Sequence, residues 1–185
     1  MRPAIASQAN AASGIAQIST VRHGMRIALV FVLAFCIAPL ASAQKAIDIT
    51  PSYIAGIHLG MSQAQARSAM TRPIRIDRLE DGYMRLVSSK QKLESYFRTG
   101  TKGVAVVTTW NRQLQTDEQV GPCSTVTALK NAYGSRLVPF KEGGKTVAYR
   151  LANLIFTLNG SRVGTVALGH GTQAMYVALS ATQCA

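Results

Sequence analysis

Two histidines carry side chains that could do acid–base or metal chemistry. His58 precedes a segment with helical spacing, and His170 stands between two glycines in Gly169-His170-Gly171. An imidazole titrates near neutral pH and serves as a general base or a metal ligand. Neither histidine has a carboxylate or nucleophile beside it in sequence, so we interpret both as solvated loop residues. A small hydrolase using His58 or His170 stays open as an alternative function.

The cysteines offer either a reactive thiol or a cross-link. Cys123 lies at the front of a predicted helix, where a free thiol would have a lowered pKa. Cys184 lies at the other end of the same half of the chain, and paired cysteines are the default in an exported protein. We therefore predict a Cys123–Cys184 disulfide. The spacing of cysteines and histidines fits no metal site, and we expect no cofactor and no catalytic residue.

A short charged stretch follows the first predicted helix. Its acidic residues could do acid–base work as a pair, but they alternate with arginines. We interpret the stretch as a solvated, salt-bridged loop before the first strand. Its acidic residues are Asp77, Glu80 and Asp81, and the arginines are Arg75, Arg78 and Arg85.

Aromatic residues are spread along the predicted strands. Exposed rings on a sheet face can form the centre of a protein interface or stack on nucleic-acid bases. A possible binding face comprises Tyr96, Trp110, Tyr149 and Tyr176. The aromatic and arginine patterns of known RNA-binding sheets are absent from the sequence, so we expect no specific nucleic-acid recognition.

The first 43 residues have the pattern of an export signal. Met25-Arg26 precedes the apolar run 27–37, and Ala41-Ser42-Ala43 follows as an exit for signal peptidase. We predict a signal peptide over 25–43, a true start at Met25 with 1–24 upstream of it, and a single exported domain over 44–185. An uncleaved membrane anchor is the alternative. The predicted location is the periplasm or the cell exterior.

The chain is strongly basic. Twenty Lys and Arg residues face only eight Asp and Glu residues, which gives a formal net charge of +12. Such an excess favours anionic partners, although the basic residues are scattered along the sequence. A module that binds anionic envelope polymers is therefore a second alternative.

Two segments carry complete helix signals. Ser62 with Gln65 forms a capping box, and the apolar residues Ala66, Ala69 and Met70 follow. In the second segment Ser124 and Thr125 can cap, and Val126, Leu129 and Tyr133 lie on one face before Gly134 ends the helix. These patterns predict helices near 62–70 and 125–133.

The two helical segments also match each other at an offset of 63 residues, and strand-like runs follow each. The fold class that we predict is α+β: a tandem repeat of a short helix followed by antiparallel strands, over about 52–114 and 115–185. Asn159-Gly160 and Gly100–Gly103 are expected hairpin turns. The expected strands are 83–88, 93–98 and 104–110, then 146–151, 154–158, 162–168 and 174–180.

Short motifs in both halves carry a resemblance to a known family. Leu59-Gly60-Met61-Ser62 stands before the first helix, Val120-Gly121-Pro122-Cys123-Ser124-Thr125 before the second, and Ala132-Tyr133-Gly134 at its end. This pattern is similar to the repeats of the β-lactamase inhibitor protein and of outer-membrane assembly lipoproteins of the SmpA/OmlA type. Unlike those lipoproteins, the chain has no lipobox at the end of the leader. The resemblance implies a non-enzymatic exported protein that binds a protein or a cell-envelope component.

Overall fold

The computed structural model describes residues 48–80, 82–181 and 183–184, which belong to one compact unit, Ala43–Ala185. The predicted signal peptide and its cleavage site lie outside the described residues. Within the described part of the chain, no helix is both long and apolar enough to cross a membrane.

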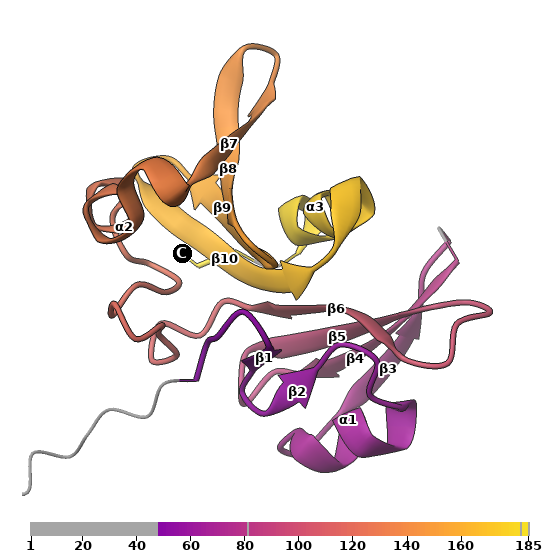
Figure 1. Cartoon of the computed structure of the whole chain (residues 1–185). Coiled ribbons are helices and arrows are strands. Elements are labelled where there is room, and N and C mark those ends of the chain that lie inside the picture. Colours follow the sequence, from indigo (N-terminus) through magenta and orange to yellow (C-terminus); the bar gives the residue numbers. More distant parts are fainter. Residues whose placement is uncertain (1–47, 81, 182, 185) are drawn as a thin grey trace, which may run out of the picture. The chain divides into compact units, whose positions relative to one another are not determined.

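The unit combines three α-helices with antiparallel strands, which confirms the α+β class (Figure 1). In chain order, the first half contains β1 (Tyr53–Ile54), β2 (Ile57–His58), α1 (Gln63–Ala69), β3 (Arg75–Arg78), β4 (Tyr83–Ser88), β5 (Leu93–Arg98) and β6 (Val104–Thr109). The second half contains α2 (Val126–Tyr133), the 3-10 helix η1 (Gly134–Arg136), β7 (Val138–Glu142), β8 (Lys145–Leu151), β9 (Leu154–Asn159), β10 (Arg162–Gly169) and α3 (Gly171–Ser180).

Eight strands form a single antiparallel sheet in the order β3-β4-β5-β6-β10-β9-β8-β7, and β1 with β2 forms a separate ribbon. Each half of the sheet is a meander, and the two meanders join where β6 pairs with β10. Tight turns link the strands of the second meander. Gly143 and Gly144 both have positive φ and close the β7–β8 hairpin, as a two-residue turn of this kind requires.

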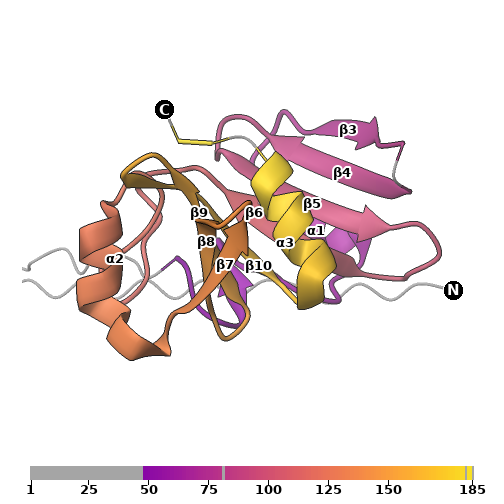
Figure 2. The ribbon, with the colours of Figure 1, turned by 90° about the horizontal axis from the view of Figure 1, so that it is seen from above.

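Apolar side chains pack on both faces of this sheet. The larger core includes Ile54 and Ile57 of the ribbon, Ala66 of α1 and Leu129 of α2. The smaller core contains residues of α3, including Met175, packed against strand residues that alternate with those of the larger core. Figure 2 shows α3 lying across the middle of the sheet, over β6 and β10.

Both predicted helices are confirmed with their caps. Ser62 and Gln65 form a reciprocal capping box at α1. At α2 the Thr125 side chain accepts from the amide of Ala128, and Gly134 with φ of +52° ends the helix. The glycine is needed there because a left-handed residue is costly for any side chain with a Cβ.

The turns that precede the two helices have the same hydrogen bonds. The Gly60 amide donates to the Val104 carbonyl, and the Val104 amide donates back to Met61, both at 2.8 Å. Before α2, the Cys123 amide donates to Val163 and the Val163 amide donates to Ser124, again both at 2.8 Å. Gly60 and Cys123 both have positive φ, at +82° and +68°.

The prediction of a strand over 174–180 was wrong, because these residues belong to α3. Alternation of Met175, Val177 and Leu179 suggested a strand, yet the buried residues follow helical spacing: Ala174, Met175, Val177 and Ala178. The physical reason lies in the sheet. Since β10 pairs with β9 on one side and with β6 on the other, a further strand has no free edge beside it.

Two edge strands escaped prediction. The charged stretch that we interpreted as a loop contains β3, which pairs with β4, and β7 pairs with β8 at the opposite edge. Both strands are mostly exposed, so neither shows the alternation of apolar residues that marks a half-buried strand. The two-residue hairpin after β9 is confirmed, with Gly160 and Ser161 as its loop.

Candidate functional site

The predicted disulfide is present between Cys123 and Cys184, whose Cα atoms lie 5.7 Å apart. The tail that carries Cys184 is further held by backbone contact, since its amide donates to the Gly164 carbonyl at 2.7 Å. Asn159 donates from its side chain to the Cys184 carbonyl at 3.2 Å. The cross-link therefore ties the chain end to β10 and to the front of α2.

The four aromatic residues predicted as a binding face do not share one exposed surface. Tyr96 is buried in the core below α3, and Tyr149 is buried in the core on the other sheet face. Trp110 is half-buried at the end of β6. Tyr176 alone among the four is well exposed, at 57%, where its ring meets Phe140 edge to face. Packing therefore accounts for Tyr96 and Tyr149.

The two histidines belong to different elements, and both are exposed. His58 is exposed at the end of β2, where its ring lies 5.3 Å from the ring of Tyr53. His170 is exposed directly before α3. Neither imidazole forms a hydrogen bond or an ion pair with another residue that the structure describes; the backbone carbonyl of His58 accepts from the Met61 amide at 3.4 Å.

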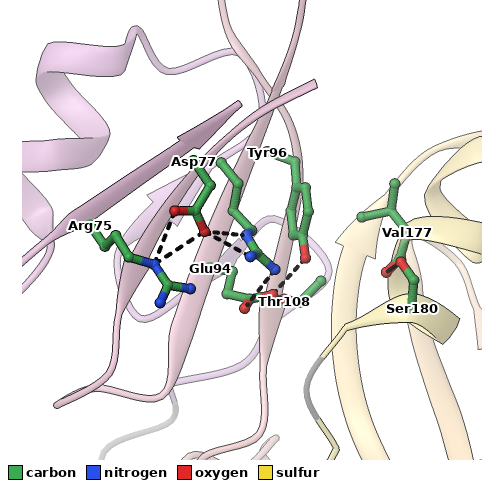
Figure 3. A network of polar contacts seen from close by, with 8 residues as sticks. Arg75, Asp77, Glu94, Tyr96, Thr108, Val177 and Ser180 are labelled. Atoms are coloured by element: carbon green, nitrogen blue, oxygen red, sulfur yellow. Dashed lines mark hydrogen bonds and ion pairs between the residues drawn. The ribbon is translucent and has the colours of Figure 1, made fainter. Parts of the chain in front are cut away.

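A row of polar side chains crosses β3, β4, β5 and β6 on the sheet face that carries α3 (Figure 3). Its central residue is Arg85, whose guanidinium lies between two carboxylates. It donates to Asp77 at 2.7 Å and to Glu94 at 3.4 Å. Arg75 extends the row outward, with 3.0 Å between its Nε and Asp77.

Glu94 anchors the inner end of this polar row. Its side chain is only 2% exposed, yet its carboxylate is fully used: Tyr96 donates to it at 2.6 Å and Thr108 at 3.2 Å, besides Arg85. A buried carboxylate needs such partners, because an unpaired buried charge is very costly. Exposure then rises along the row to 67% for the Arg75 side chain.

The charges and the burial of the row move the pKa values of Asp77, Arg85 and Tyr96 further from neutral pH. The hydrogen bond from Arg85 is the main cause that lowers the pKa of Asp77; burial opposes it and Arg75 reinforces it. Burial by itself would lower the pKa of Arg85, but its bond to Asp77 and the charge of Glu94 outweigh that and raise it. Burial, with the negative charge of Glu94, raises the pKa of Tyr96.

The row has one exposed end and one covered end. Figure 3 shows Val177 and Ser180 of α3 beside the end that holds Tyr96 and Thr108, while Arg75 lies at the end away from the helix. The row is therefore a fixed set of donors and acceptors that emerges from beneath α3 onto open strands. A surface of this kind can recognise a partner by complementary charge and hydrogen bonds.

Sequence reasoning expected salt bridges in the stretch that holds Arg75, Asp77 and Arg85, but it placed them in a loop. It did not find the inner residues of the row, Glu94, Tyr96 and Thr108, although a signal for them existed. Arg75 and Asp77 alternate with Ile76, and Glu94 and Tyr96 alternate with Ser95, the two-residue period of a sheet face. What the sequence does not show is the pairing that sets Arg85 opposite Asp77 on one side and Tyr96 on the other.

No protein-family model, no curated protein and no solved structure matches this chain. Its function is therefore argued from the geometry of the described residues.

Proposed function

We propose that the protein is a non-enzymatic, exported binding protein that recognises a protein or a cell-envelope component through the polar row of β3–β6. The observation that carries this proposal is the change in exposure along the row. Buried Glu94 holds the inner end rigid, and Arg75 presents its guanidinium to solvent at the outer end. Preorganised polar groups lose little entropy on binding, which favours recognition.

The chemistry of the row supports binding over acid–base catalysis. A general acid or base works best with a pKa near the working pH. Here the arginines hold the pKa of Asp77 below its ordinary value, and burial moves the pKa of Tyr96 further from neutrality. Both groups are thus stabilised in their resting protonation states, and Arg85 already pairs with both carboxylates of the row.

The disulfide supports the exported location. Disulfides form and persist in oxidising compartments such as the periplasm or the cell exterior. The Cys123–Cys184 bond closes a segment with a sequence separation of 61 residues, and it is compatible with the signal peptide predicted over 25–43.

We further infer that α1 with β3–β6 and α2 with β7–β10 are two copies of one ancestral unit. The N-caps Ser62 and Thr125 stand 63 residues apart, the offset found in the sequence. At the same offset, Gly60 and Cys123 share a left-handed backbone.

Burial and hydrogen bonding at matched positions support the same inference. The pairs Ile57 with Val120 and Ala66 with Leu129 are all buried. The reciprocal backbone bonds of Val104 in β6 have a counterpart at Val163 in β10, at an offset of 59 instead of 63 residues. The duplication is what the resemblance to the β-lactamase inhibitor protein and the SmpA/OmlA lipoproteins implies, and those resemblances in turn favour a binding role.

Affinity capture tests the proposal. The domain 44–185 is immobilised and exposed to an envelope extract, and retained components are identified by mass spectrometry. Arg75→Gln removes the exposed guanidinium and keeps the rest of the row. Because an exposed ion pair contributes about 0.2–1 kcal/mol, recovery should fall by a factor of roughly 1.4 to 5.

Arg112→Gln is the matched control, since Arg112 is exposed on the connection after β6 and its substitution removes the same charge. Its recovery should equal that of the unmodified domain. Equal recovery on all three resins, or no component retained above a blank resin, would contradict binding through the row.

A further inference from the structure

A second charged feature lies at the end of strands β4 and β5, apart from the polar row. A hollow of about 550 Å³ is lined there by three permanent cations: Arg78, Arg98 and Lys102. A neighbouring hollow of about 420 Å³ shares Arg98 and adds His170. Arg98 therefore stands between the two and contributes to both.

The charge balance of the larger hollow is one-sided. Among the residues that the structure describes, no carboxylate lines it, and Arg78, Arg98 and Lys102 form no ion pair with another described residue. Elsewhere on the same sheet, Arg85 lies between two carboxylates. Three cations that line one concave site raise the local concentration of anions and repel cations.

The loop that carries Lys102 is held in place by backbone bonds. The Thr99 amide donates to the Gly82 carbonyl at 2.7 Å, and the Thr101 amide and hydroxyl donate to the Arg98 carbonyl at 3.0 and 2.8 Å. Gly103 lies so close to the Gly60 backbone that a Cβ would meet the Gly60 oxygen at 2.5 Å. Lys102 is thus presented by a braced turn, while Arg78 and Arg98 are the last residues of β3 and β5.

The hollow also has buried aromatic residues and further hydrogen-bonding groups in its lining. Tyr83 and Phe97, which are 4% and 5% exposed, line it from the two cores on opposite faces of the sheet. Gln63 of α1 and Thr99 of the loop add side chains that can donate to an oxygen. Its volume falls in the range of sites for small ligands.

We propose that this hollow binds a small molecule carrying two or more phosphate groups. A single phosphate would engage one guanidinium fork, whereas an oligophosphate spans several cations at once. Arginine suits this ligand because its planar fork donates to phosphate oxygens in pairs. Arg98 is the central contact because it lines both hollows, and Arg78 and Lys102 line the larger hollow with it.

Calorimetric titration with sodium tripolyphosphate tests the proposal on the domain 44–185, at constant ionic strength. The unmodified domain should bind one equivalent. Arg98→Gln should weaken binding roughly tenfold or more, because a charge-assisted hydrogen bond contributes about 1.5–3 kcal/mol. Lys102→Gln should weaken it by a smaller factor, and Arg112→Gln should leave it unchanged. Thermal melting of each variant checks that it is folded.

Three results would overturn the proposal. Equal affinity of Arg98→Gln and Arg112→Gln would show that only the overall positive charge attracts the anion. Orthophosphate binding as tightly as tripolyphosphate would remove the need for several phosphate groups. Citrate binding as tightly would show that the site does not select phosphate.

This proposal is independent of the role of the polar row. Arg98→Gln should leave the capture of an envelope partner unchanged, and Arg75→Gln should leave tripolyphosphate binding unchanged. Failure of one proposal is therefore distinguishable from failure of the other.

Discussion

Replacement of Glu94 tests whether the polar row is built around a buried charge. Glu94→Ala removes the acceptor of three donors and leaves the Tyr96 and Thr108 hydroxyls buried without it. Glu94→Gln keeps the size of the side chain and one oxygen for Tyr96, but it removes the charge that faces Arg85. The two variants thus separate the cost of lost hydrogen bonds from the cost of lost charge.

The expected magnitudes follow from burial and from what each partner retains. An unsatisfied buried hydroxyl costs about 1–3 kcal/mol, so Glu94→Ala should lower the free energy of unfolding by about 3–5 kcal/mol. Glu94→Gln should cost only about 1–2 kcal/mol, because Arg85 keeps its shorter bond to Asp77, at 2.7 Å. On thermal melting the alanine variant should lose roughly 10–15 °C.

Urea unfolding, followed by circular dichroism, measures both variants. Glu118→Ala is the matched control, since Glu118 is exposed in the connection before α2 and its loss should change stability by less than about 0.5 kcal/mol. A double variant with Arg85→Ala should show a coupling of about 0.5–3 kcal/mol with Glu94→Ala. If Glu94→Ala costs no more than Glu118→Ala, the row is not organised by a buried carboxylate and the reasoning fails.

Two further predictions concern the disulfide and pH. Joint replacement of Cys123 and Cys184 by serine opens a loop with a sequence separation of 61 residues. On the chain-entropy model this should lower the free energy of unfolding by about 4 kcal/mol, measured by urea unfolding. A loss below about 1 kcal/mol would contradict this prediction. Asp77→Asn should cost about 1 kcal/mol at pH 7. Because the pKa of Asp77 is lowered in the folded state from its ordinary value of 3.8, this stabilisation is complete above that value and is lost as pH falls through the lower folded pKa. The unfolding curves of Asp77→Asn and the unmodified protein should therefore converge in strong acid, and a constant gap would refute the assignment.

The helices and hairpins could be predicted because their signals are local. Ser62 and Gln65 are three residues apart in sequence, so their side chains meet as soon as the first turn of α1 forms. Gly134 ends α2 because the backbone there has a positive φ, which glycine adopts easily. The disulfide could also be predicted, because only Cys123 and Cys184 lie outside the predicted signal peptide.

The edge strands and α3 could not be predicted because tertiary partners decide them. β3 is a strand through its pairing with β4, and its exposed residues carry no apolar alternation. The spacing of Met175 and Val177 fits either a strand or a helix. The strand is excluded because β10 already has β6 on one side and β9 on the other. The polar row depends on cross-strand register between β3, β4 and β5, which no short stretch of sequence encodes.

The two halves of the sheet differ most on the face that carries α3, and this difference argues for placing recognition in the first half. In the second half, Ala148 and Ile155 pack in the core beneath α3, while the tail carrying Gln183 and Cys184 lies against Thr157 and Asn159. In the first half, the corresponding face carries Arg75 and Asp77 away from α3 (Figure 3), and Arg85 lies opposite Asp77 on the neighbouring strand. If the halves descend from one unit, the disulfide-tied tail has covered the second copy and has left the first with an open charged face. This asymmetry predicts that Arg75→Gln lowers the capture of the envelope partner. Arg150→Gln, at an exposed residue of the second half, should leave that capture unchanged.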